Sequence, residues 1–227
     1  MGKTVSGCHI TFDSIDVPVS RGLGSSAALI VAGATAANFL LGNPLNKQEI
    51  LTICNNIEGH PDNLSPAIYG GLTASLVAEA IPYSVHYNIH SDLKFVALIP
   101  DFELSTKLAR SVLPKEIPFK DAVFNSSHLA VLLKALEEGN EALISVALND
   151  RLHQPYRKNL IKGYEIAEKT AKSLGCISFF ISGAGPTCLC ITKSDTFKDE
   201  LEKALRNENI NWQVLSLSID TLGATVL

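Results

Sequence analysis

Hydrophobic and polar residues follow different periods along the first ninety positions, and each period predicts a different element. Residues 8–18, CHITFDSIDVP, alternate apolar and polar positions up to a proline, which predicts a strand that runs into a turn. Residues 27–41 are rich in Ala, Leu, Ile and Val and stop before Gly42, which predicts a helix. Asn46, followed three residues later by a glutamate, predicts the capped start of a second helix that runs to about Ile57.

The pattern changes near Ser91, where we place a boundary between two domains, 1–90 and 91–227. Residues 58–71, EGHPDNLSPAIYGG, read as a loop between the second helix and the next strands. The second domain alternates strand and helix patterns around a central hairpin, which predicts an α+β layered domain. Strands are expected near 72–78, 83–89, 93–100, 176–183, 187–193 and 212–219, and helices near 105–110, 121–138, 140–148, 160–174 and 194–206.

Composition and charge exclude several classes of partner. The 227 residues carry a net charge of −4 and a pI of about 5.9, which argues against nucleic acid or an anionic membrane as the main partner. The longest apolar run is shorter than the ~20 residues of a spanning helix. The cysteines form no framework pattern, so we expect reduced thiols in a cytoplasmic protein: Cys8, Cys54, Cys176, Cys188 and Cys190.

A glycine-rich stretch, PVSRGLGSSAA, stands directly before the first helix pattern. Glycines let an anion approach backbone N–H groups, and a helix N-terminus adds partial positive charge. The Walker pattern is excluded because the loop has no lysine, and the dinucleotide pattern matches only formally, without a buried strand before it. The stretch therefore predicts either a phosphate-binding loop or a tight turn made of small residues for packing.

Polar residues cluster in EGHPDN, where Glu58, His60, Asp62 and Asn63 surround a proline. Together with a hydroxyl, a carboxylate suits Mg²⁺, whereas the single histidine lacks a partner at zinc-ligand spacing. The alternative is a polar loop stabilised by turn hydrogen bonds. No clear general base stands out, and the loop setting of Asp62 favours a structural role.

Arginines and a second glycine loop complete the candidate chemistry. Arg110, Arg151 and Arg157 could bind a carboxylate or phosphate as planar forks, or could lie on solvated helix faces. ISGAGPT follows a strand, and its two glycines, proline and threonine exceed what a plain hairpin turn requires.

Together these motifs resemble those of the GHMP kinases. PVSRGLGSSAA is similar to the second motif of the family, SGAGPT is similar to the third, and EGHPDNLSPAIYGGL, LSTKLAR and LHQPYR resemble homoserine kinases. The resemblance implies a first domain like domain 2 of ribosomal protein S5, followed by a ferredoxin-like α/β sandwich. It also implies ATP-dependent phosphorylation of the L-homoserine hydroxyl in threonine biosynthesis, with Mg²⁺, in a cytoplasmic enzyme that is commonly a homodimer.

The resemblance assigns roles to the residues that match its motifs. Ser26 and Glu58 would hold Mg²⁺, and these two with Arg157 would act in catalysis. ATP would be bound by Pro18, Arg21, Gly22, Leu23, Gly24, Ser25, Ser26, Ala27 and Ala28. L-homoserine would be bound by His60, Asn63, Arg110, Arg157, Gly183, Gly185 and Thr187, with both arginines on its carboxylate.

One family feature has no counterpart in this sequence. The first family motif, rich in Asn and Gly and ending in an acidic residue, is not found in the 17 residues before Pro18. We therefore expect a first domain that is incomplete at its start. Two alternatives follow: a non-catalytic module that binds nucleotide or a small molecule, and a sister kinase that acts on another small alcohol, such as mevalonate.

Overall fold

The computed structural model describes residues 7, 9–14 and 17–226, which divide between two compact units. The first unit contains residues 24–87 and 219–226 together with the described residues up to 19, and the second contains residues 20–23 and 88–218. Each unit has its own hydrophobic core. The predicted domain bounds, 1–90 and 91–227, stay a prediction.

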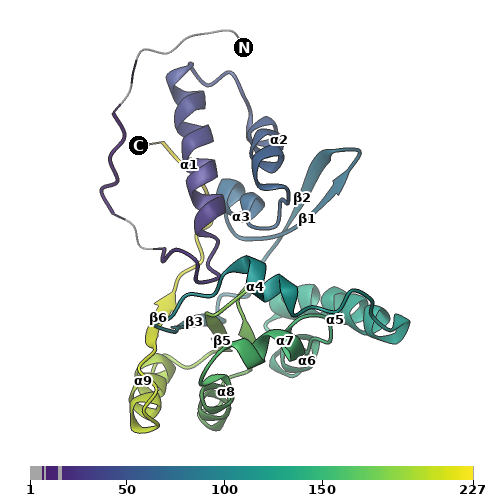
Figure 1. Ribbon diagram of the computed structural model, residues 1–227, viewed down its shortest axis with the longest axis vertical. Helices are drawn as coiled ribbons and strands as arrows, with labels where there is room; N and C mark the ends of the chain where they lie inside the picture. The colour runs from purple at the N-terminus through teal and green to yellow at the C-terminus, as the bar shows by residue number, and fades with distance from the viewer. Residues whose placement is uncertain (1–6, 8, 15–16, 227) are drawn as a thin grey trace. The chain divides into compact units, whose positions relative to one another are not determined.

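Three helices form the body of the first unit: α1 (Ser25–Leu40), α2 (Lys47–Glu58) and α3 (Leu64–Tyr69) (Figure 1). They pack pairwise on one another. Their shared core consists of Ala27, Val31, Ile50, Leu51, Cys54, Leu64 and Ile68. The sequence predicted α1 and α2 but treated α3 as loop, because its six residues contain a proline and lie between polar and glycine-rich segments.

The predicted capping of α2 is confirmed in detail. The Asn46 side chain accepts a hydrogen bond from the Glu49 N–H at 3.0 Å, and the Glu49 carboxylate accepts one from the Asn46 N–H at 2.8 Å. Gly59 ends the helix in the left-handed conformation at φ 89°. The end of α2 therefore places Glu58 as the last helical residue before the polar loop.

An antiparallel hairpin, β1 (Leu72–Ala78) and β2 (Ile81–Tyr87), completes the first unit. The strand predicted over 8–18 is wrong where the structure describes it, because residues 9–14 and 17 form no strand; Cys8, Ile15 and Asp16 lie outside the described residues. Alternation alone does not make a strand, since the backbone groups also need a neighbouring strand. Among the described residues, the sheet of the first unit pairs β1 with β2 alone.

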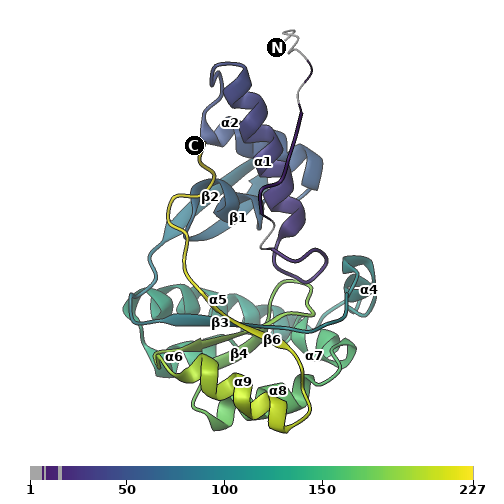
Figure 2. The same cartoon turned by 90° about the vertical axis from the view of Figure 1, so that its left-hand side faces the viewer.

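The second unit is built on a four-stranded antiparallel sheet. Its strands are β3 (Lys94–Ile99), β4 (Ser178–Ile181), β5 (Cys188–Thr192) and β6 (Gln213–Leu217), in the order β4-β5-β3-β6. Two helices, α8 (Tyr164–Ser173) and α9 (Phe197–Asn207), lie on one side of the sheet (Figure 2). Because helices connect β3 to β4 and β5 to β6, the predicted ferredoxin-like sandwich is confirmed.

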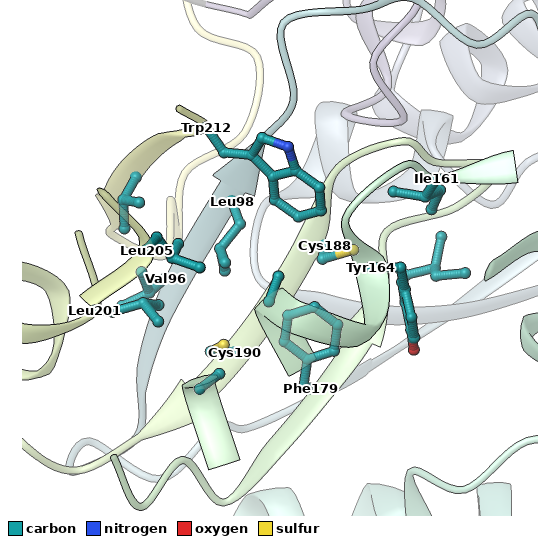
Figure 3. Packing of buried hydrophobic residues seen from close by; sticks show 14 of the residues in the cluster. Val96, Leu98, Ile161, Tyr164, Phe179, Cys188, Cys190, Leu201, Leu205 and Trp212 are labelled. Atoms are coloured by element: carbon teal, nitrogen blue, oxygen red, sulfur yellow. The ribbon is translucent and has the colours of Figure 1, made fainter. Parts of the chain in front are cut away.

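The core of the second unit lies between this sheet and the two helices. Figure 3 shows labelled side chains of β3, β4 and β5 packed among Tyr164 of α8 and Leu201 and Leu205 of α9. Phe179 packs edge-to-face on Tyr164, with ring centroids 5.2 Å apart. Cys188 and Cys190 are fully buried in this core, which confirms the prediction that they are small buried hydrophobic residues.

A helical segment is inserted between β3 and α8. It comprises α4 (Thr106–Ser111), α5 (Phe119–Glu138), α6 (Glu141–Ala147), α7 (Gln154–Arg157) and the short 3-10 helix η1 (Lys158–Leu160). The sequence predicted one helix over 160–174, but α8 begins at Tyr164, because Gly163 precedes it in the left-handed conformation at φ 92°. This segment carries all three candidate arginines: Arg110, Arg151 and Arg157.

The last residues of the chain return to the first unit. The Gly71 N–H donates to the Asp220 carbonyl at 2.7 Å, and the Lys47 ammonium donates to the Leu222 carbonyl at 3.1 Å. Within the described part of the chain, no helix has both the length and the apolar character that crossing a membrane requires.

Candidate functional site

The first glycine loop is divided between the two units. Residues 20–23 pack in the second unit, whereas Gly24 and the residues after it belong to the first. The two halves of the predicted ATP-binding loop are therefore positioned by different cores, and each is described within its own unit.

The first-unit half of the loop is the N-terminus of α1. Gly24 stands at the N-cap in the left-handed conformation, at φ 75°, and a Cβ there would lie 3.5 Å from the Asn63 side chain. The first N–H groups of a helix have no partner within the helix, so those that follow Gly24 can bind an anion. Ala27 is buried in the core and offers a ligand only its backbone. Ser25, Ser26 and Ala28 share the same first turn.

Ser26 and Glu58 are brought together in the first unit. The Ser26 hydroxyl donates a hydrogen bond to Glu58 Oε2 at 2.8 Å, although the two residues are 32 positions apart. A hydroxyl and a carboxylate are hard oxygen ligands of the kind that Mg²⁺ prefers. In residues 7, 9–14 and 17–226, no three His, Cys, Asp or Glu side chains gather as metal ligands. The pair therefore suits an ion that takes its other ligands from phosphates and water.

The EGHPDN loop folds around Asp62. Its Oδ1 atom accepts a hydrogen bond from the Asn63 N–H at 2.8 Å and lies 2.7 Å from His60 Nδ1. Asp62 thus orients the imidazole of His60 and the turn that leads into α3. This geometry agrees with the structural role expected for Asp62, and places His60 and Asn63 on the same loop as Glu58.

In the second unit, the two glycine loops pack directly against each other. A Cβ on Gly22 would lie 2.5 Å from the Ser182 carbonyl oxygen and 2.8 Å from that of Gly185. The Ser182 hydroxyl donates to the Gly22 carbonyl at 2.7 Å, and the Thr187 N–H donates to the Arg21 carbonyl at 3.2 Å. The second glycine loop therefore fixes the backbone that leads into Gly24 and the start of α1.

The side chain of Arg21 is also used for support. Its guanidinium donates to the carbonyl oxygens of Pro100, through Nη1, and Asp101, through Nη2, at the end of β3. Leu23 is the last residue of the segment held in this unit, whereas Pro18 belongs to the first unit. The Arg21 side chain thus links the first glycine loop to the sheet of the second unit.

The substrate residues predicted in the second glycine loop differ in exposure. Gly183 is exposed, whereas Gly185 and Thr187 are buried. Within the described residues, the Thr187 hydroxyl has no hydrogen-bond partner. In this structure, the loop therefore presents Gly183 to solvent and keeps Thr187 within the packing of the loop.

Arg157 is held at the centre of the polar groups of the second unit. Its Nε donates to the Ala109 carbonyl at 3.1 Å, and its Nη1 donates to the Gly183 carbonyl at 3.0 Å. Burial lowers the pKa of Arg157, and the nearby positive charge of Arg110 lowers it further. The structure thus places Arg157 near Arg110 and the Gly183 carbonyl, and the carboxylate-binding role of the two arginines stays a prediction.

Sequence reasoning missed two polar residues beside Arg157. Asp150 accepts hydrogen bonds from the N–H groups of His153 and Gln154 at 2.8 and 2.7 Å, and so holds the start of α7. His153 Nδ1 lies 3.4 Å from Arg157 Nη1. The sequence carried no periodic signal for them, because Asp150 and His153 lie in the segment before α7 and not on a helix face.

Two family models match the chain. The GHMP kinases N terminal domain matches residues 1–71, and the GHMP kinases C terminal domain matches residues 132–211. These matches cover both glycine loops in the order that the sequence motifs indicated.

Curated relatives and a solved structure narrow the family. The homoserine kinase of Clostridium beijerinckii is 40% identical over all of this chain and 76% of its own length. That of Crocosphaera subtropica is 46% identical over 93% of this chain and 70% of its own length. The crystal structure of homoserine kinase from Cytophaga hutchinsonii superposes with a TM-score of 0.84 at 29% identity, over 92% of this chain and 69% of that one. The chain belongs to the homoserine kinase family of the GHMP kinases.

Proposed function

We propose that the protein transfers the γ-phosphoryl group of ATP to the side-chain hydroxyl of L-homoserine, which yields O-phospho-L-homoserine for threonine biosynthesis. The observation that carries the proposal is the position of Arg157. Its guanidinium is oriented by two carbonyl oxygens beside a second guanidinium, that of Arg110. Two neighbouring positive charges are stabilised by an anion, and the α-carboxylate of an amino acid is such an anion.

Phosphoryl transfer depends mainly on positioning and on charge stabilisation, so the absence of an obvious base among the described side chains is compatible with it. The N–H groups at the start of α1 would bind phosphate oxygens, and the backbone of Gly22 would approach them without a side chain. Each unit thus contributes part of the groups that the reaction requires.

The pair formed by Ser26 and Glu58 fits Mg²⁺ by its chemistry and its spacing. When bound, the ion would neutralise negative charge on the β- and γ-phosphates. Ser26 would supply a hydroxyl oxygen and Glu58 a carboxylate oxygen. The hydrogen bond between the two side chains holds both oxygens close together.

The residues of each unit that match the substrate-binding motifs would bind the amino-acid end of the substrate. His60 and Asn63 would contact polar groups of homoserine, and Arg110 and Arg157 would bind its carboxylate. Gly183, Gly185 and Thr187 would shape the substrate-binding loop, with Thr187 acting through the packing of that loop because it is buried.

The proposed substrate is tested by rates of ADP release with L-homoserine, mevalonate and shikimate. We expect turnover with L-homoserine alone; turnover of either other alcohol without L-homoserine turnover would contradict the proposal.

Arg157→Ala should raise the KM for L-homoserine by roughly tenfold or more and leave the KM for ATP unchanged, because a charged hydrogen bond is lost. Arg151→Ala is the matched control, since Arg151 stacks on Phe124 and pairs with Asp121 instead.

Two further features belong to the same proposal. A cytoplasmic location is supported by ATP as substrate and by the four described cysteines, which are all free. A homodimer is expected from the family, and sedimentation of the purified protein measures it.

A further inference from the structure

Three polar side chains of the second unit lie in a row that ends at Arg157. The row begins at Asp150, in the loop after α6, passes through His153 and ends at the Arg157 guanidinium on α7. Nε2 of His153 lies 3.8 Å from Asp150 Oδ1, and Nδ1 of the same ring lies 3.4 Å from Arg157 Nη1. The imidazole is therefore placed between a carboxylate and a guanidinium.

Hydrogen bonds hold the Asp150 carboxylate, the first group of this row, in place. One carboxylate oxygen accepts the N–H groups of His153 and Gln154, and the other accepts the Asn125 amide of α5 at 2.6 Å. Burial acts to raise the pKa of Asp150, but these hydrogen bonds outweigh it, and the pKa lies below its ordinary value. Asp150 is thus ionised and immobile, and the start of α7 is tied to α5.

The contact with arginine determines the protonation state of His153. A guanidinium only donates hydrogen bonds, so Nδ1 must accept one, and the proton of the neutral ring then lies on Nε2, toward Asp150. Burial lowers the pKa of His153, and the positive charge of Arg157 lowers it further against the opposing effect of Asp150. His128 of α5 lines the same cavity as His153.

Arg157 gains a third fixed contact from this arrangement. The carbonyl oxygens of Ala109 and Gly183 and the His153 ring together hold Nε and Nη1. Across residues 7, 9–14 and 17–226, Nη2 donates no hydrogen bond to the protein, so it stays available to an anion. Without such contacts, a long side chain beside the charge of Arg110 would turn away and lose orientation.

We propose that His153 is a positioning residue for Arg157: it accepts a hydrogen bond from Nη1 in the tautomer that carries its proton on Nε2, beside Asp150, and so orients the guanidinium toward the substrate carboxylate. This inference rests on the proposed carboxylate-binding role of Arg157. It assigns no chemical step to His153, which acts only through the arginine.

The test compares two replacements of the same ring. His153→Leu removes the acceptor at similar volume, whereas the carbonyl of His153→Asn can occupy the position of Nδ1. The dissociation constants of L-homoserine and of a non-hydrolysable ATP analogue are measured by isothermal titration, together with thermal midpoints. We expect His153→Leu to weaken L-homoserine binding roughly tenfold, His153→Asn to restore most of it, and the analogue to bind all variants equally.

Equal binding of L-homoserine by His153→Leu and the wild type would overturn the inference, and so would failure of His153→Asn to restore binding. If His153→Leu does not fold, His153→Gln takes its place, because its amide group reaches the position of Nε2 and not that of Nδ1. Arg157→Ala separates the two proposals. If that variant binds L-homoserine normally, the proposed role of Arg157 fails; if it binds weakly while His153→Leu binds normally, only the role of His153 fails.

Discussion

At the scale of single residues, the fold brings polar and charged groups together from distant positions in the sequence. Ser26 and Glu58 meet across 32 residues, and Arg157 bonds to carbonyl groups 48 and 26 positions away. Each of these residues lies in a motif that made it a candidate from the sequence, and its role stays a prediction. It missed His153 and Asp150, whose roles come from hydrogen bonds to backbone and to a neighbouring side chain.

Glu58→Gln should lower the Mg²⁺ dependence of turnover. A neutral amide binds Mg²⁺ more weakly than a carboxylate, so the Mg²⁺ concentration for half-maximal rate should rise by tenfold or more, whereas L-homoserine binding should change little. A Mg²⁺ titration of the initial rate measures this shift, and Glu116→Gln, at an exposed position, should titrate like the wild type. An unchanged Mg²⁺ requirement in Glu58→Gln would remove Glu58 from the metal site.

His153 should make the second unit less stable in mild acid. Burial holds the pKa of His153 below the ordinary value of about 6.5, so the unfolded chain binds a proton more readily than the folded one. The stabilising contribution of the neutral ring is complete above the unfolded pKa and is lost as pH falls through the folded pKa. Thermal midpoints between pH 7.5 and 5 should fall less for His153→Asn than for the wild type; equal slopes would contradict the neutral assignment.

At the scale of elements, the sequence predicts a capped helix end better than it predicts a short helix. The strand β1 and the capping box of α2 lie where the sequence predicted them. α3 and α7 were missed because each has six residues or fewer and contains a proline, so neither shows a helical period. The strand predicted over 8–18 failed where described, since pairing is a tertiary property that alternation does not contain.

The helices α1 and α2 can be tested by two substitutions of opposite sign, one at a cap and one in a helix interior. Asn46→Ala removes the capping box of α2 and should lower the free energy of unfolding by about 1 kcal/mol. Gly33→Ala in α1 should raise it by up to about 1 kcal/mol, because a Cβ there meets nothing within 4 Å. Urea unfolding followed by circular dichroism measures both, and a stabilising Asn46→Ala would contradict the capping geometry.

Packing of the two glycine loops predicts a specific cost at Gly22. A Cβ at this position would lie 2.5 Å from a carbonyl oxygen, and the φ of 80° adds strain. Gly71 has a similar φ of 68° but open space around it, so Gly71→Ala isolates the conformational strain. We expect Gly22→Ala to lower the free energy of unfolding by about 1–3 kcal/mol more than Gly71→Ala. Equal losses in urea unfolding would show that the loops do not pack as described.

At the scale of the whole molecule, the candidate site residues are divided between two units, each with its own core. The first unit carries the helix N-terminus and the pair of Ser26 and Glu58, and the second carries Arg110, Arg157 and the second glycine loop. The family motifs made the fold predictable, including the ferredoxin-like sheet. They did not predict that residues 20–23 pack with the second unit and residues 219–226 with the first, because such packing depends on contacts between distant segments.

The central claim is that this chain transfers a phosphoryl group to the hydroxyl of L-homoserine. Phosphorus NMR of a reaction with ATP, Mg²⁺ and L-homoserine tests it most directly, because it identifies the product as well as the loss of ATP. The account predicts a new phosphate-monoester signal, coupled to the side-chain methylene protons, that requires all three components and that Arg157→Ala strongly reduces at low L-homoserine. Binding of both ATP and L-homoserine without this signal, or a monoester formed on another alcohol but not on L-homoserine, would contradict it.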